Sequence, residues 1–428
     1  MAASNGQAKI RAEWERPDLV RRLLRALAFA SRSIDALVEP AAAGIPGSIA
    51  DRGLVREKFV AETALLLYCA WPVRQLDARL PQAIDAIAQR LIPLARHADV
   101  CAAICLDPGQ ALDHAAGHIW LRAIGYQDEA VDRLLNDSLA SPFGPDRLPY
   151  RQLEQLWLTR LCRGAAPPGR IEGRLIRDSM LGRPIDALGS TRLDVYGFTH
   201  AAMYASDFGG KPVSLPGPAW IAEASAMAGL AIAVDDGDHD LTAEILMTWP
   251  MLRRRWPAAA GFAFAWLARA EDDRGFLSGK SFDAEVHARL NGQERDWYEI
   301  VSSYHTVYVM ALLCAVALRA DRLPPSSMPA RRRTRGAGQA IIALIDGPVP
   351  GDGTIHGMAV ALRADQQDEL APLFLDMILR RAATTGNLAL ISRALSLAMR
   401  HGVTDSLALK QAAALLRRSC LLAELSGR

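Results

Sequence analysis

The segment EIVSSYHTVYVMALLCAVALR at residues 299–319 is typical of a helix in the core of an all-helical protein. Its side chains from Val307 to Leu318 are apolar on all sides, which indicates a helix surrounded by other helices. This run stops at Arg319 and is too short to cross ~30 Å of hydrocarbon. Because Tyr304 and His305 precede the run, we expect an inner helix whose first half faces polar surroundings.

The same helical pattern recurs along the chain. Residues 59–71 are typical of a second buried helix, and apolar residues between 84 and 94 recur mostly every three to four positions. Short turns containing Gly, Asp or Asn separate the helices, as at 123–129 and 235–240, where a Gly can end one helix and a polar residue can cap the next. No alternating run of Val, Ile and Thr predicts a strand. We therefore predict an all-α protein, either an α/α toroid or a curved helical array of antiparallel helix pairs.

Two linkers divide the chain. The adjacent prolines at 167–168 interrupt any helix through residues 164–169, because proline removes a hydrogen-bond donor and clashes with the preceding turn. A second Pro-rich linker at 323–336 contains Arg331, Arg332, Arg333 and Arg335, which form either a surface loop or a site for an anionic partner. We expect an N-terminal helical unit at 1–164, a central unit with the candidate site at 170–322, and a C-terminal helical region at 336–428.

Charge and cysteine content exclude several classes of protein. Lys and Arg total 49 and Asp and Glu total 47, so the net charge of +2 lacks the basic excess of a nucleic-acid-binding protein. The N-terminus has no apolar segment typical of a secretion signal, and six cysteines are too few for a disulfide framework. We expect a cytoplasmic protein that binds a small molecule or peptide, without nucleic-acid or membrane partners; an oligomer is compatible with this composition.

Common cofactor and nucleophile motifs are absent from the sequence. It contains no phosphate loop, no strand-linked G-x-G-x-x-G, no G-x-S-x-G elbow and no C-x-x-C. The sequence therefore predicts no cofactor-binding residues, and the identity of any cofactor stays unknown.

Residues 194–209, DVYGFTHAAMYASDFG, place four polar groups on one face of a predicted helix. Tyr196, His200, Tyr204 and Asp207 follow one another at steps of four, four and three residues. Such a stripe is costly to bury unless each group is paired, so it forms either a satisfied hydrogen-bond network or the wall of a wet cavity. On the second interpretation His200 is the general base or acid, Asp207 orients it, and Tyr204 donates a hydrogen bond to developing negative charge.

The helix that contains residues 299–319 supplies a second polar group of this kind. Tyr298, Ser302 and His305 share one face by steps of four and three, and Tyr304 lies on the adjacent face. A hydrogen-bonded aromatic cluster is one explanation. The alternative is that His200 and His305 face one cavity, with His305 as a second proton carrier and Tyr304 as a second hydrogen-bond donor.

Two histidine clusters have spacings that suggest a metal. His114 and His118 are four residues apart and could bind one ion, but position 115 lacks the glutamate of the zinc-protease motif. Two unconnected imidazoles and a metal pair completed by distant carboxylates both stay open. His97, Cys101 and Cys105 span eight residues, or ~12 Å of helix, which is too far for one ion to contact all three. No metal ligand is therefore assigned.

The acidic turn at residues 235–240 resembles part of a calcium loop. Calcium loops need Gly at the sixth position and Glu at the twelfth, and Gly237 comes too early. We expect Asp238 or Asp240 to cap the helix that follows.

Four segments together resemble a bacterial all-helical family of unassigned function. The resemblance covers about residues 145–320 and implies a helical fold, without an activity to carry over. The matching segments are Pro149-Tyr-Arg-Gln-Leu-Glu-Gln-Leu-Trp157, the Thr199-His200…Tyr204…Asp207-Phe-Gly motif, Asp238-His-Asp-Leu…Glu244, and Ser303-Tyr-His-Thr…Tyr308.

These observations favour a small-molecule biosynthetic enzyme that uses His, Asp and Tyr acid–base chemistry in a helical cavity. Its reaction would be of the lyase, cyclase or hydrolase type. The alternative is a non-catalytic helical scaffold that binds a peptide or partner protein. Convergence of His200, Asp207 and His305 on one solvent-reachable pocket would favour the enzyme, and dispersed or dry groups would favour the scaffold.

Overall fold

A computed structural model describes most of the chain, and its described part is all-α, as the sequence predicts. It contains twenty α-helices, three short 3-10 helices and no strand. The basic cluster predicted around residue 333 lies outside the described residues. The structure describes residues 14–38, 55–141, 144–164, 169–325, 336–345, 355–404 and 406–426.

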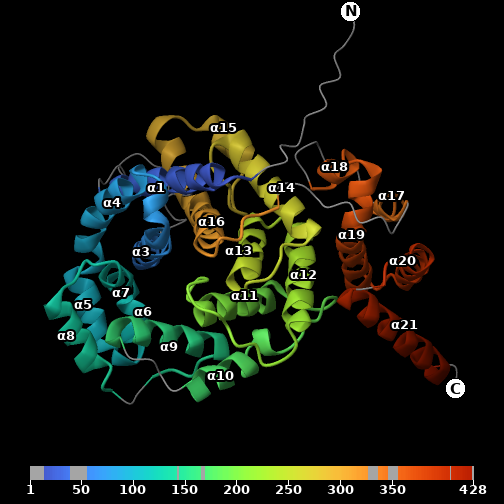
Figure 1. The fold of residues 1–428 in the computed structure, drawn as a ribbon, viewed down its shortest axis with the longest axis horizontal. Coiled ribbons are helices and arrows are strands. Elements are labelled where there is room, and N and C mark those ends of the chain that lie inside the picture. The colour runs from blue at the N-terminus through green and yellow to red at the C-terminus, as the bar shows by residue number, and fades with distance from the viewer. Residues whose placement is uncertain are drawn as a thin grey trace, which may run out of the picture.

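Six helices pack in a closed sequence of neighbours, which we call the inner circuit (Figure 1). Each of these six helices contacts the next member of the circuit, and the last contacts the first, so helices distant in sequence become neighbours. In order, they are α3 (Arg56–Ala70), α7 (Ala116–Ala123), α9 (Pro149–Arg163), α11 (Arg192–Ser206), α13 (His239–Met251) and α16 (Gly292–Arg319).

Apolar side chains on every face explain why these helices lie inside. Helix α13 is buried along its whole length from Asp240 to Met251, and α16 is buried from Thr306 to Leu318. The inner helix expected at residues 299–319 is thereby confirmed. Within the described residues, α16 is the one helix long and apolar enough to cross a membrane. However, 83% of its most apolar window is buried inside the protein, as in the core helix of a soluble protein.

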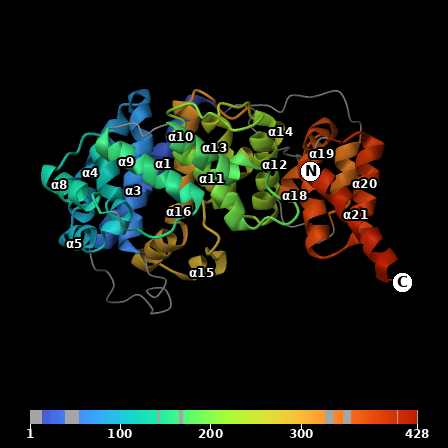
Figure 2. The same ribbon diagram turned by 90° about the horizontal axis from the view of Figure 1, so that it is seen from below.

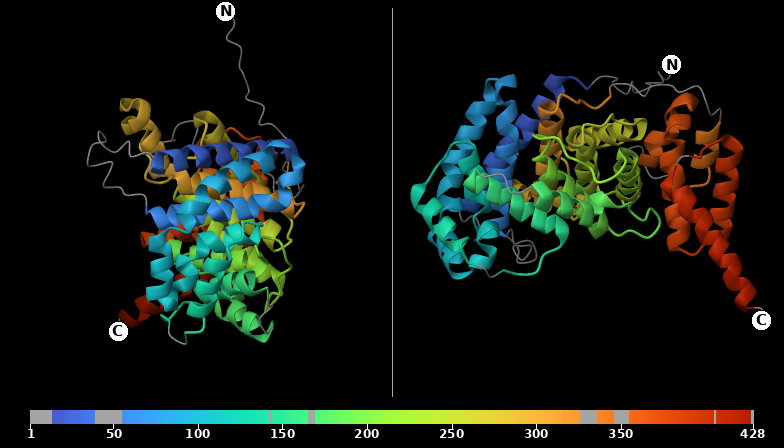
Figure 3. Two further views of the ribbon diagram at one scale, coloured as in Figure 1. Left: turned by 90° about the vertical axis from the view of Figure 1, so that its left-hand side faces the viewer. Right: turned by 60° about the horizontal axis from the view of Figure 1, so that its bottom comes forward.

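The other helices before residue 325 precede the circuit helices in the sequence or lie between them. Helix α1 packs on α16, seen as dark blue beside orange in Figure 3, and α4 packs on α3, α10 on α9 and α12 on α13. Three 3-10 helices lie in the connections between these helices: η2 (Trp71–Leu76), η3 (Pro108–Gln110) and η4 (Met180–Gly182). These outer helices are α1 (Arg16–Val38), α4 (Arg79–Ala95), α5 (Ala98–Leu106), α6 (Ala111–His114), α8 (Glu129–Ser138), α10 (Gly169–Asp178), α12 (Ala219–Asp235), α14 (Ala258–Arg274) and α15 (Ala284–Arg289).

The linker expected near residue 167 does not separate two cores. Helices α1 and α3 precede it and pack on α16, and α9 packs on α11 across it. Buried apolar residues from both sides belong to one continuous cluster. The proline pair therefore interrupts helix formation locally, while the inner circuit continues across it.

The C-terminal helices form a separate layer against the outer side of the circuit. Figure 2 shows them at one end of the molecule, where α19 and α21 contact α12, and α18 and α19 contact α14. Ion pairs of Asp235 with Arg380 and Arg381 reinforce the junction with α12. These helices are α17 (Ala337–Ile342), α18 (Ile355–Val360), α19 (Ala364–Thr384), α20 (Leu388–His401) and α21 (Leu407–Ser426).

Candidate functional site

Four helices of the inner circuit bring three carboxyl groups and two imidazoles together. We call this group the central cluster. Its members make a continuous chain of contacts, since His305 contacts Glu62 and Asp240, and Glu244 lies one turn from Asp240 beside His200. The cluster consists of Glu62 on α3, His200 on α11, Asp240 and Glu244 on α13, and His305 on α16.

The start of α13 positions the two most buried carboxyl groups. Asp238 caps this helix by accepting a hydrogen bond from the backbone N–H of Leu241 at 3.0 Å, which confirms one of the two expected caps. Asp240 and Glu244 then point from successive turns of the same face and are only 5% and 2% exposed. Because the cap fixes where the helix begins, it also fixes the direction of both carboxyl groups.

Hydrogen bonds hold Asp240 by one oxygen only. The Tyr196 hydroxyl donates to Oδ2 at 2.7 Å, and Arg192 Nη2 lies 3.3 Å from the same atom. The other oxygen, Oδ1, is buried and accepts no hydrogen bond, although His305 Nε2 is within ion-pair distance at 3.3 Å. One carboxylate oxygen is thus anchored while the other is directed into the cluster.

Glu244 is held in a similar way. The hydroxyl of Thr199 donates to its Oε2 at 2.7 Å, and His200 Nδ1 lies 3.6 Å from the same oxygen. Burial raises the pKa of Glu244 well above its usual range, and the negative charge of Asp240 raises it further. The cluster therefore favours the protonated form of Glu244 over the charged form.

Asp240 behaves in the opposite way. Burial alone would raise its pKa, but His305, the Tyr196 hydroxyl and Arg192 together lower the pKa to about 2. Two carboxyl groups one helical turn apart are thus driven to different protonation states, an arrangement that recurs at sites of acid–base chemistry.

His305 lies between two carboxylates. Its Nδ1 is 3.0 Å from Glu62 Oε2, and its Nε2 is 3.3 Å from Asp240 Oδ1. Burial opposes the charged imidazolium, but Asp240 and Glu62 outweigh burial and hold the pKa of His305 well above its usual value. The side chain keeps 35% of its surface exposed, so solvent reaches this part of the cluster.

His200 is neutral by contrast. Burial lowers its pKa to about 4, and the charges of Arg151 and His305 act in the same direction. Its Nδ1 lies 3.0 Å from the backbone carbonyl of Tyr196, which can only accept, so Nδ1 carries the proton and Nε2 is left as an acceptor. The side chain is 23% exposed.

Aromatic rings confine His200 on several sides. Ring centroids of Tyr196, Tyr204 and Tyr150 lie 5.4, 5.8 and 6.0 Å from that of the imidazole. The face predicted from steps of four residues thus exists through Tyr204, whose hydroxyl donates to Glu154 Oε1 at 2.7 Å. The expected donor Tyr304 packs against Phe59, with a centroid distance of 5.4 Å.

Asp207 is not the partner of His200. Helix α11 ends at Ser206, and Asp207 follows in the left-handed conformation at φ 52°, so the face predicted from helical spacing stops before it. Its Oδ1 accepts hydrogen bonds from the Tyr68 hydroxyl at 2.5 Å and from Trp157 Nε1 at 2.9 Å. Glu244, rather than Asp207, is the carboxyl group beside His200.

Asp207 instead anchors a neighbouring helix. Arg319 places Nη2 3.1 Å from Asp207 Oδ2 and donates from Nη1 to the Asp207 carbonyl at 2.7 Å. The residue therefore joins the ends of α11 and α16, which is a structural task.

The histidine pair considered as a metal site does not act as a unit. The helix is interrupted at Ala115, between α6 and α7. His118 is fully buried and contacts Asp132 Oδ1 at 3.1 Å, whereas His114 lies 3.7 Å from Asp107. Each imidazole thus has its own partner.

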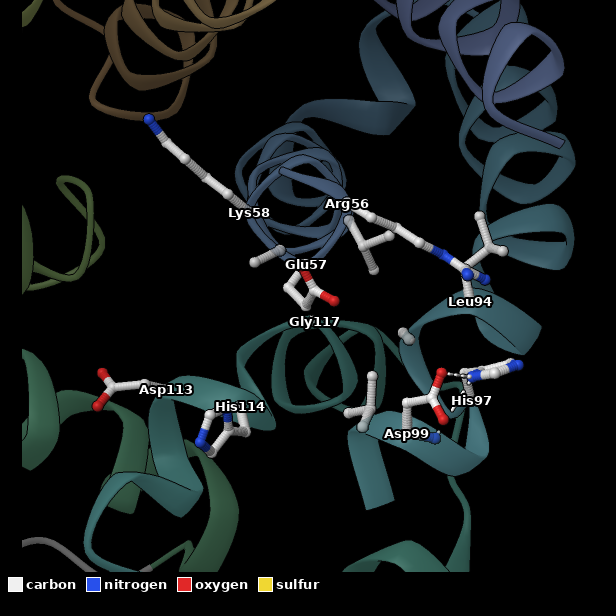
Figure 4. A pocket seen from close by; sticks show the side chains of 13 residues that line it. Arg56, Glu57, Lys58, Leu94, His97, Asp99, Asp113, His114 and Gly117 are labelled. Carbon is white, nitrogen blue, oxygen red and sulfur yellow. Dashed lines mark hydrogen bonds and ion pairs between the residues drawn. The ribbon is translucent and has the colours of Figure 1, made fainter. Parts of the chain in front are cut away.

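His97 and His114 instead line one cavity of about 180 Å³ near the start of α3. Figure 4 shows His97 paired with Asp99 on one side of this cavity. His114 lies on the other side, and its imidazole does not face that of His97. The nitrogen Nδ1 of His97 also accepts from the backbone N–H of Asp99 at 3.3 Å, which caps α5. Lys58 also lines this cavity, and its Nζ lies 3.6 Å from Glu62 of the central cluster (Figure 4).

Sequence reasoning missed three carboxyl groups of the central cluster. Asp240 was considered as a helix cap and as part of a matching segment, Glu244 only as part of that segment, and Glu62 was not considered. The available signal was an isolated acid in an otherwise apolar buried helix, which needs a partner wherever it is buried. Which partner it finds depends on packing between helices and is not encoded in local spacing.

The fold and the cluster define an all-helical protein with a buried, partly solvent-reachable group of ionisable side chains. A family model described as a domain of unknown function, DUF6895, matches residues 23–315. The chain therefore belongs to this family, and the match contains every member of the central cluster as well as the segments that carried the resemblance. No curated protein and no solved structure matches the chain.

Proposed function

We propose that the protein is a small-molecule enzyme that carries out acid–base chemistry at the central cluster. The observation that carries this proposal is the convergence of His200 and His305 with three carboxyl groups from four helices. Removing ionisable groups from water costs several kcal/mol each, so a fold selected for stability alone gains little from gathering five of them. The partial exposure of both imidazoles, at 23% and 35%, supports access for a substrate.

His200 is the group we propose as the proton acceptor. Its Nδ1 is directed at the Tyr196 carbonyl, so Nε2 can receive a proton from a bound substrate. His305 is the second candidate proton carrier, held between Glu62 and Asp240. Tyr204 keeps a supporting role beside His200. The reaction would be of the lyase, cyclase or hydrolase type, which fits a biosynthetic enzyme.

The closed order of packing in the inner circuit supports an α/α toroid, one of the two predicted architectures. In such a fold the faces of the inner helices surround a central site, a common place for ligands. We further propose a cytoplasmic location, with a small molecule or peptide as partner and without nucleic-acid or membrane contact. The near-neutral net charge of +2 and the burial of α16 support this.

Two matched substitutions test the proposal. His200→Gln removes the proposed proton acceptor, and His118→Gln removes a fully buried imidazole paired with Asp132 and Arg96 away from the cluster. Each purified protein would be incubated with metabolite extracts, followed by mass spectrometry, and its unfolding by urea would be measured. We expect His200→Gln to fold within about 1 kcal/mol of the wild type and lose turnover, whereas His118→Gln loses about 1–3 kcal/mol and keeps turnover.

The scaffold alternative predicts a different pattern. If the cluster is only a structural network, His200→Gln will destabilise the protein as much as His118→Gln, and the wild type will leave every metabolite unchanged. That combination would refute the enzyme proposal.

A further inference from the structure

We propose that the central cluster binds one divalent transition-metal ion, with Asp240, Glu244 and His305 as its protein ligands. This inference deepens the proposed function and rests on the same site. With the ion bound, His305 is a ligand in place of a proton carrier, and His200 remains the proposed proton acceptor. Each of the three residues offers one ligand atom, and these atoms lie within 4.8 Å of one another. Three ligands of an ion with bonds of about 2.0–2.2 Å lie about 3–4 Å apart, so side-chain movements of up to about 1–2 Å would close the set.

Each proposed ligand is already fixed from its far side. His305 directs Nδ1 to Glu62 at 3.0 Å, which leaves Nε2 facing Asp240 and Glu244. Histidine ligands of metals almost always donate their other ring N–H to a carboxylate or carbonyl in this way, because the contact fixes the ring and raises its basicity.

The two carboxyl groups repeat this arrangement. Tyr196 holds Asp240 by Oδ2, and Thr199 holds Glu244 by Oε2. In both cases the second oxygen is left for an ion. Metal-ligating carboxylates are commonly oriented by such hydrogen bonds.

The buried Oδ1 of Asp240 also points to a missing ligand, because its one close partner is His305 Nε2, itself a proposed ligand, at 3.3 Å. Asp240 is 5% exposed, and its Oδ1 is buried without a hydrogen bond. Buried polar atoms in native proteins are nearly always satisfied, and an unsatisfied one costs about 1–3 kcal/mol. A cation bound at Oδ1 removes this cost.

The donor set indicates the class of ion. Two carboxylate oxygens and one imidazole nitrogen suit Mn²⁺, Fe²⁺ or Zn²⁺, whereas Mg²⁺ and Ca²⁺ favour oxygen ligands alone and Cu⁺ favours sulfur. Three protein ligands leave positions open for water or substrate, as in catalytic metal sites. His200, 3.6 Å from Glu244, would lie next to such a bound molecule.

Metal binding can be measured without knowing a substrate. The wild type would be stripped with EDTA, dialysed, and titrated separately with Mn²⁺ and Zn²⁺ by calorimetry, and the bound metal would be counted by mass spectrometry. Co²⁺ would be added as a spectroscopic probe of coordination by imidazole and carboxylate. We expect one ion per chain with at least one of the three metals.

Four variants test the site: two at proposed ligands, one at a supporting residue and one control. Asp240→Asn and His305→Gln should each lower affinity at least 100-fold, and Glu62→Gln, which only supports His305, should lower it about 10–100-fold. Glu154→Gln is the matched control, because this buried glutamate lies on a circuit helix but contacts Tyr204 instead of the cluster. It should bind metal like the wild type, and thermal unfolding would verify that every variant is folded.

The inference is overturned if the stripped wild type binds no more metal than folded Asp240→Asn, or if Glu154→Gln weakens binding as much as the ligand substitutions. Its failure is distinguishable from failure of the proposed function. Turnover that persists in EDTA but is lost in His200→Gln would reject the metal and retain the enzyme. One tightly bound ion, sensitive to Asp240 and His305, would support the metal site even before a substrate is known.

Discussion

Replacing Asp207 by alanine should destabilise the protein without acting directly on the central cluster. The carboxylate accepts hydrogen bonds from Tyr68 and Trp157 and forms an ion pair with Arg319. A hydrogen bond to a charged group is worth about 1.5–3 kcal/mol, so the two donors account for about 3–6 kcal/mol. The ion pair adds at most about 1 kcal/mol, since both partners retain about 20% exposure. Partial relaxation should bring the total loss to about 3–5 kcal/mol.

Urea unfolding of wild type and Asp207→Ala, monitored by circular dichroism at 222 nm, measures this loss directly. Asp207→Asn is the companion variant, because asparagine keeps one acceptor oxygen and also tolerates the left-handed backbone at this position. It should lose less, about 1–3 kcal/mol, because a neutral amide accepts weaker hydrogen bonds from Tyr68 and Trp157 and gives up the ion pair with Arg319. Unchanged stability of Asp207→Ala, combined with loss of turnover, would show that Asp207 belongs to the chemistry after all and would refute this reasoning.

Three further outcomes are expected. Burial raises the pKa of Asp376 to about 7, so the folded state holds this proton more tightly than the unfolded state does. The free energy of unfolding should therefore fall by up to about 4 kcal/mol as pH rises from about 4 to 7. A pH series of urea unfolding should show a flatter profile for Asp376→Asn. A profile unaltered by that substitution would contradict the assignment. Arg22→Met should cost about 3–5 kcal/mol because it removes the nearest partner of the buried Glu271 and leaves only Arg25 at 3.5 Å. The double variant Arg22→Met/Glu271→Leu should recover most of this loss in the same assay. No recovery would indicate that packing, and not charge, dominates. Saturation with metal at 1,000 times Kd should stabilise the wild type by about 4 kcal/mol, seen as an increase in Tm that EDTA reverses, whereas an equal increase in Asp240→Asn would contradict the ligand assignment.

Local sequence patterns were sufficient to predict the helices and to single out two histidines that the structure brings near each other. Apolar residues on all sides of residues 307–318 predicted an inner helix, and α16 is buried there. Polar groups in such helices, namely His200 and His305, had to meet partners, and the structure brings both to one cluster. These predictions succeed because helical spacing and burial are properties of a short segment.

Predictions that depended on where a helix ends or on which helices meet were less accurate. Asp207 was assigned to the face of His200 by assuming that the helix continues, but the chain turns into the left-handed conformation at that residue. Asp240 and Glu244 lie one turn apart on a buried helix, yet their partners are on α11 and α16. No local pattern specifies such partners, because they follow from the packing of helices that are distant in sequence.

The contact that closes the inner circuit has a consequence for the nascent protein. Thr63 on α3 and Tyr308 on α16 are hydrogen-bonded at 3.1 Å although 245 positions separate them. Until α16 has been synthesised, Glu62 therefore lacks its partner His305. The charged groups of α3 and α13 stay exposed to solvent in the incomplete chain during this time. Contacts between such distant residues slow folding, so this chain should depend on chaperones during synthesis more than a helical bundle built from local contacts.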